Sequence, residues 1–202
     1  MMTFTDYLRS VTLCGVHELD RRDRQHEVAR SRQRTPRLAR YQLDVVGAHV
    51  ADVVDSAGGW LFDRVMAGWD VRVAVAHAGD LDALRILGVQ PTALRVMFDG
   101  SDLPTALALA GAVCGEDDRV RDALAASVRS ARTEVTVWGD VWLPSVGRRG
   151  AEVCHQLSAA ARVFKAQAAV AAGLDSTVGP VEAFRSYGQG VRTEYQDLMP
   201  VS

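Results

Sequence analysis

The sequence predicts an α/β protein: a small, at least partly parallel sheet of three to four strands, flanked by helices and carrying long helical N- and C-terminal extensions. Two observations lead to this prediction. The spacing of apolar residues switches between helical and alternating periods along the chain, and helix, glycine and strand follow one another in that order. The 202 residues are 48% hydrophobic and 24% charged, which suits one sizeable globular core.

Three parts follow from this pattern. Residues 1–40 form an N-terminal extension with an arginine-rich segment, residues 41–175 form the α/β domain, and residues 176–202 form a C-terminal tail packed on that domain. A composition rich in Ala and Val, with Lys165 as the sole lysine, is typical of proteins from high-G+C bacterial genomes such as those of actinobacteria.

The first predicted element of the domain is an amphipathic helix starting near Tyr41. Its apolar stripe has helical spacing and comprises Leu43, Val46, Val50, Val53, Val54 and Ala57. The pair Gly58-Gly59 interrupts the stripe, which resumes over 60–66, so the pattern allows two helices or one helix with a kink.

Three strands are expected from alternation and β-branched residues, at 71–76, 93–98 and 133–138. Residues 80–88 are ambiguous: Asp80 is able to cap a short helix closed by Gly88, or 84–87 form a fourth strand.

Helices are expected over three further stretches. A cap at Ser101 or Asp102 opens the first, which Gly115 ends; the second carries acidic residues at 116–118 and runs to Ala131. The third has the cleanest stripe, from Val153 to Gly173, and places Cys154 near the sheet and His155 toward solvent. The remaining residues, with several glycines, are typical of an extended tail.

Charge is unevenly distributed. Residues 18–40 carry eight arginines against four acids, a charge of +4, so the remainder carries −6 in a chain of net charge −2. Arginines bind phosphates and carboxylates bidentately, and this segment is the predicted contact for a protein or nucleic-acid partner. Interleaved acids and the lack of aromatics favour instead a solvated segment with internal ion pairs. The predicted contact residues are Arg21, Arg22, Arg24, Arg30, Arg32, Arg34, Arg37 and Arg40.

The cysteine pattern and the length of the apolar runs indicate the cellular compartment and whether a cofactor is expected. Three scattered cysteines form no disulfide framework, and no signal peptide or transmembrane run is visible, so we expect a cytoplasmic protein without membrane contact. Cys14 and His17 have no second pair to complete a metal site, and no cofactor motif occurs. The oligomeric state stays open.

Acidic residues and one histidine follow the predicted strands. In open α/β sheets ligands bind beyond the carboxyl ends of the strands. Convergence there would let carboxylates hold Mg²⁺ or Mn²⁺ for phosphoester hydrolysis. The alternative is that each aspartate only caps a helix or a turn. The four candidate catalytic residues are His77, Asp80, Asp99 and Asp140.

The sequence contains no GxSxG, phosphate loop, GxGxxG or HExxH motif. We therefore expect a non-catalytic binding or regulatory module, with a metal-dependent phosphoester hydrolase as the alternative.

Overall fold

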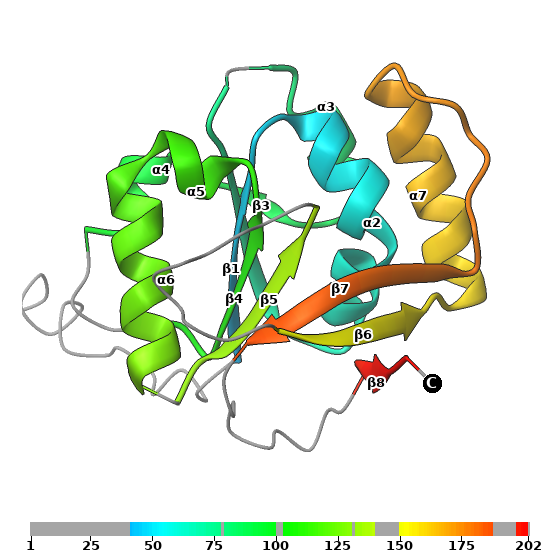
Figure 1. Cartoon of the computed structure of the whole chain (residues 1–202). Helices are drawn as coiled ribbons and strands as arrows, with labels where there is room; N and C mark the ends of the chain where they lie inside the picture. The colour runs from blue at the N-terminus through cyan, green and yellow to red at the C-terminus, as the bar shows by residue number, and fades with distance from the viewer. Residues whose placement is uncertain are drawn as a thin grey trace, which may run out of the picture. The chain divides into compact units, whose positions relative to one another are not determined.

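A computed structural model describes residues 41–77, 79–99, 103–130, 132–139, 150–187 and 197–201. These residues belong to one compact unit, Arg40–Ser202, built as a mixed sheet with helices on both faces (Figure 1). The arginine-rich segment lies outside the described residues, so its predicted partner contacts stay predictions. No helix in the described part of the chain is long and apolar enough to cross a membrane.

The sheet has eight strands in the order β3-β2-β1-β4-β5-β7-β6-β8. The first five are mutually parallel, and β7, β6 and β8 continue the sheet in antiparallel pairs. The strands are β1 (Gln42–Gly47), β2 (Asp70–Val75), β3 (Gln90–Pro91), β4 (Ala106–Ala110), β5 (Glu134–Trp138), β6 (Ala151–Gln156), β7 (Val181–Tyr187) and β8 (Met199–Pro200).

Helices α2, α3 and α7 pack together on one face of the sheet, and α4, α5 and α6 lie on the other (Figure 1). Their bounds are α2 (Val50–Met66), α3 (Asp82–Ile86), α4 (Leu94–Met97), α5 (Val113–Glu116), α6 (Asp118–Ser130) and α7 (Ala159–Ala171). The core between these layers is apolar: Leu43, Val45, Trp60, Leu61 and Leu107 are all at most 1% exposed.

The α/β prediction is confirmed, but the sheet is larger than the three to four strands expected. Strand β1 was missed because its apolar residues also fit the helical stripe that continues into α2. Both sides of β1 are covered by helices, so its residues are buried on both faces and show no alternation.

Two further elements differ from the predicted ones, the first of them for the same reason. The expected helix from Ser101 to Gly115 contains β4, whose sequence Ala-Leu-Ala-Leu-Ala is fully buried between parallel neighbours. The expected strand at 93–98 is the short helix α4. At 80–88 the helical alternative is correct: α3 is followed by Gly88 at φ +75°, a conformation that favours glycine.

The C-terminal third differs most from expectation. The helix expected from Val153 to Gly173 is strand β6 followed by α7, and the expected tail supplies β7 and β8. Consequently His155 is 7% exposed instead of facing solvent. These strands pair with residues distant in sequence, so local spacing carried little signal for them.

The glycine pair lies inside one continuous helix, α2. The Glu182 carboxylate on β7 accepts the backbone N–H groups of Gly59 and Trp60, at 2.9 and 2.8 Å. A Cβ on Gly59 would approach Leu157 within 2.0 Å, so only glycine allows this close contact. Lys165 on α7 completes the junction by donating to Glu182 and to the Asp55 carbonyl. The interruption in the stripe therefore marks a polar junction between α2, α7 and β7.

Candidate functional site

The carboxyl edge of the parallel strands brings two histidines together. His49 follows β1 and precedes α2, and His77 follows β2. The backbone N–H of His77 donates to the Ala48 carbonyl at 3.0 Å, which extends the pairing of β1 with β2 to this point. The two imidazole rings stack with centroids 4.5 Å apart and an interplanar angle of 23°.

One carboxylate contacts this histidine pair, and a second fixes the turn beside it. Glu116, at the end of α5, lies 3.2 Å from His77, measured between Oε2 and Nε2. Asp52, in the first turn of α2, accepts the Ala48 backbone N–H through Oδ2 and the indole N–H of Trp138 through Oδ1. Both Asp52 oxygens are thereby engaged, and its role is to fix the turn after β1 against β5.

A pocket of about 210 Å³ opens at this edge. His49, His77 and Asp80 provide its polar groups, and the end of α7 closes one side. The other lining residues are small or apolar, which leaves room for a compact ligand group: Val50, Ala51, Gly79, Ala171 and Ala172. His77 and Glu116 are each about half exposed, at 51% and 48%, so water reaches the pair.

The structure brings together two of the four predicted catalytic residues. His77 and Asp80 share the carboxyl-edge pocket, whereas Asp99 lines a different pocket, with Arg119 and Leu107. Asp140 lies outside the described residues. Asp80 also accepts the backbone N–H of Asp82 ahead of α3, which is the capping role considered as the alternative.

Sequence reasoning missed His49, Asp52 and Glu116. The signal was present for the first two, since both follow the segment Gln42–Gly47, but its apolar residues also fit a helical stripe. Glu116 was read as part of the next helix, whereas it ends α5 at the carboxyl side of β4. Recognising β1 and β4 would have brought all three to one edge.

Metal ligands and nucleophiles are limited among the described residues. Within the described part of the chain, no group of three His, Cys, Asp or Glu side chains is arranged to hold a metal ion. Cys114 lies within α5, and burial raises the pKa of its thiol to about 11, so the reactive thiolate is scarce at neutral pH. The chemistry available at the edge is therefore that of an imidazole within ion-pair distance of a carboxylate.

No known protein-family model matches the sequence, and no curated protein matches it. Solved structures do resemble the fold. A deacetylase–teicoplanin complex from teicoplanin biosynthesis aligns with a TM-score of 0.53 and 16% identity over 75% of this chain and 100% of that one. A triple mutant of a deacetylase from the same pathway aligns with a TM-score of 0.49 and 21% identity over 63% of this chain and 79% of that one.

A conserved protein from Thermus thermophilus gives a TM-score of 0.45 and 16% identity over 76% of this chain and 98% of that one. At these identities the likeness to the deacetylase–teicoplanin complex shows a shared α/β fold and does not assign an activity.

Proposed function

We propose that the chain is a hydrolase that acts at the carboxyl-edge pocket and removes a small acyl group from an amide nitrogen. The observation that carries the proposal is the contact of Glu116 with His77, which itself lines a pocket of mostly small residues. The fold shared with a deacetylase that acts in teicoplanin biosynthesis supports amide hydrolysis over phosphoester hydrolysis.

The proposed roles follow from the His77–Glu116 contact. When His77 donates Nε2–H to Glu116, its Nδ1 is left to accept a proton from water. The water oxygen then attacks the carbonyl carbon, the C–N bond breaks, and the proton on His77 passes to the leaving amine. The products are a carboxylic acid and a free amine. Glu116 orients the imidazole.

Assays of the full chain for acetate released from N-acetylated amino sugars and from teicoplanin test this proposal. Replacement of His77 by alanine is expected to lower kcat/KM about 100-fold or more. Asp99→Asn, in the other pocket, is the matched control and should leave turnover unchanged. Equal turnover by wild type and the His77 variant would contradict the assignment.

The metal-dependent phosphoester alternative is tested in the same experiment. It requires Asp140 to join His77 and Asp80, because Asp99 lies in a separate pocket. Phosphate release from p-nitrophenyl phosphate that needs added Mg²⁺ or Mn²⁺ and is lost in Asp140→Asn would favour it. Acetate release that survives a chelator and Asp140→Asn would favour the histidine–carboxylate mechanism.

A second candidate is a binding module that uses the pocket without turnover. One observation favours it: both Asp52 oxygens hold N–H donors, and the described residues at the edge offer no group of three metal ligands. Binding of an N-acetylated sugar that is weakened by His77→Ala, with no acetate released, would support this candidate.

A further inference from the structure

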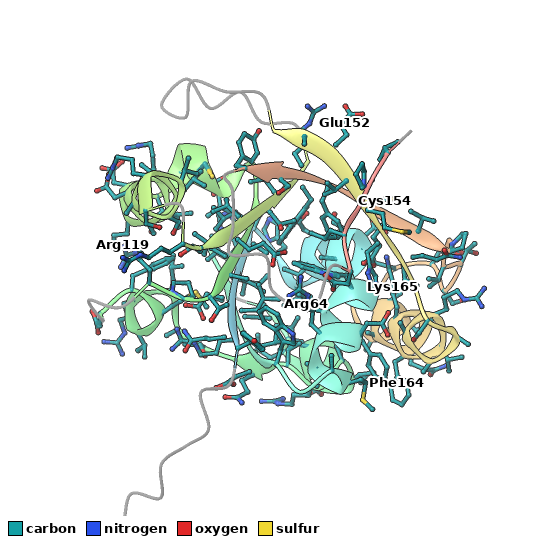
Figure 2. The ribbon with its side chains drawn as sticks, turned by 90° about the horizontal axis from the view of Figure 1, so that it is seen from below. Arg64, Arg119, Glu152, Cys154, Phe164 and Lys165 are labelled. Atoms are coloured by element: carbon teal, nitrogen blue, oxygen red, sulfur yellow. The ribbon has the colours of Figure 1, made fainter. Side chains whose placement is uncertain are left out.

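A second pocket, of about 380 Å³, lies on the other face of the molecule. It is lined by residues of α4, α6 and the segment leading into β4, and shares no lining residue with the carboxyl-edge pocket. Figure 2 shows Arg119, one of its lining residues, across the sheet from Lys165 and Phe164 of α7. A ligand here would be independent of the proposed hydrolase site.

This second pocket exists because the helices above it leave part of the sheet uncovered. Helix α4 spans only Leu94–Met97 and so covers little of the sheet beside α6. Two of the α6 residues that line the pocket are small, Ala123 and Ala126. A pocket of this volume falls in the range of small-molecule sites.

The floor of this pocket is mostly apolar with one free polar group. Leu107 and Met97 are buried, and Asp44 is neutralised by a two-point contact from Arg72, at 2.8 and 2.6 Å. Ser127 is 1% exposed, and its hydroxyl has no hydrogen-bond partner among the described residues. A buried hydroxyl without a partner is costly, so a ligand that hydrogen-bonds to it would gain free energy.

The rim carries charges of both signs. Arg95 and Arg119 provide two guanidinium groups, and Asp99 and Asp122 provide two carboxylates, all of them exposed. Arg119 is held by Asp117, and the carboxylates of Asp117 and, more weakly, Asp99 raise its pKa. Asp117, which holds Arg119 through Nε and Nη2, adds a third carboxylate beside these four groups, so the rim offers partners of both signs and does not favour a simple anion.

We propose that this pocket binds a small zwitterion with an apolar body and a polar tip, an aromatic amino acid such as tyrosine. The ligand carboxylate meets the arginines, its ammonium meets Asp99 and Asp122, and its ring enters over Leu107 and Met97. The hydroxyl at the ring tip pairs with Ser127.

Titration calorimetry on the full chain tests the proposal with four ligands: L-tyrosine, L-phenylalanine, tyramine and 3-(4-hydroxyphenyl)propionate. We expect tyrosine to bind about 10-fold or more tightly than each analogue that lacks one charge, and more tightly than phenylalanine. Equal binding of tyrosine and either one-charge analogue would overturn the zwitterion assignment, as would no binding of any of the four.

Three variants place the ligand. Ala126→Leu fills the pocket and Arg95→Gln removes one exposed charge; each should weaken tyrosine binding about 10-fold. Ser127→Ala should abolish the preference for tyrosine over phenylalanine. His77→Ala, in the carboxyl-edge pocket, should leave tyrosine binding unchanged although it lowers turnover. Because Arg95 is exposed, its variant keeps the test valid even if Ala126→Leu perturbs folding. Unchanged binding in Arg95→Gln, or lost binding in His77→Ala, would overturn the location.

Discussion

The two halves of the sheet meet their helices in different ways. Under α2, strands β1, β2 and β4 present mainly aliphatic side chains, such as Leu43, Val45 and Ala108. The antiparallel half meets α2 and α7 through buried charged and polar groups: Arg64, His155, Lys165 and Glu182. The parallel strands, covered on both faces, pack against their helices mainly through apolar side chains. The antiparallel strands β7, β6 and β8 are positioned instead by specific contacts between buried charged and polar side chains.

Arg64 is the most enclosed of these charged groups. Its guanidinium lies 4.1 Å from the ring centroid of Trp69 and 5.1 Å from that of Trp60. It donates to Glu134 of β5 and to Asp197 beside β8, at 2.9 and 2.6 Å. One α2 side chain thus ties together both halves of the sheet.

Arg64→Leu should therefore cause the largest effect, a loss of about 5 kcal/mol in the free energy of unfolding, because it leaves two carboxylates without their cation. Urea denaturation measures it. Arg64→Lys, which keeps a charge but not the planar fork, should lose about half as much. A loss below about 1 kcal/mol for the leucine variant would mean that Asp197 and Glu134 are adequately solvated without Arg64.

Lys165→Met should have the second largest effect, a loss of about 3 kcal/mol in the free energy of unfolding at pH 7. The Glu182 carboxylate then keeps its two backbone donors but loses its counter-charge. Burial raises the pKa of Glu182 despite Lys165, so a folded chain takes up this proton more readily than an unfolded one. Protonation of Glu182 therefore stabilises the fold at acid pH, and this contribution is lost as the pH rises through the pKa of Glu182 in the folded chain.

The deficit of Lys165→Met should accordingly shrink as pH falls toward 4.5, the ordinary pKa of glutamate. Unfolding free energies at several pH values measure this trend. Glu182→Gln is the matched control: it removes the charge but keeps an acceptor for α2, and should lose less than Lys165→Met at pH 7. A pH-independent deficit would contradict the role given to Glu182.

His77→Ala should change the unfolding free energy by less than about 0.5 kcal/mol, since the side chain is half exposed. Thermal denaturation alongside the turnover assay would separate function from folding at this position. A large loss of stability would show that the His49–His77 stack serves the fold.

The smallest effect on stability is expected from the arginine-rich segment. Replacing Arg21, Arg22 and Arg24 by glutamine should leave the melting temperature unchanged. If the segment binds nucleic acid, the same change should weaken that binding and flatten its salt dependence. Gel shifts at two salt concentrations measure both; binding that is absent or independent of salt would reject the nucleic-acid partner.

The parallel half shows what local sequence is able to predict. Helix α6 and strands β2 and β5 were found because their faces differ in polarity along the chain. Strands β1 and β4 were missed because burial on both faces removes that contrast, and β4 consists of alanine and leucine, which favour helices. Tertiary burial overrode the local preference.

The candidate site was predictable in part for the same reason. His77 was identified because it follows a recognisable strand, whereas His49 and Glu116 depend on strands that local spacing hides. Asp99 follows α4, not a strand, so the edge rule did not apply to it. The pairing of Glu182 with α2 joins residues more than a hundred positions apart and leaves only one local trace, the Gly58-Gly59 interruption.

The place of β7 between β5 and β6 has a consequence for the order of folding. Strand β6 is synthesised first, yet its strand partners are β7 and β8, which come later in the chain. During synthesis the sheet therefore stops at β5 until residues beyond Val181 emerge. Such long-range pairing is slow to form. Lys165 and Arg64 are likewise synthesised before their partners Glu182 and Asp197. We therefore expect the contacts of the polar junction to form last, as the step that completes the native sheet.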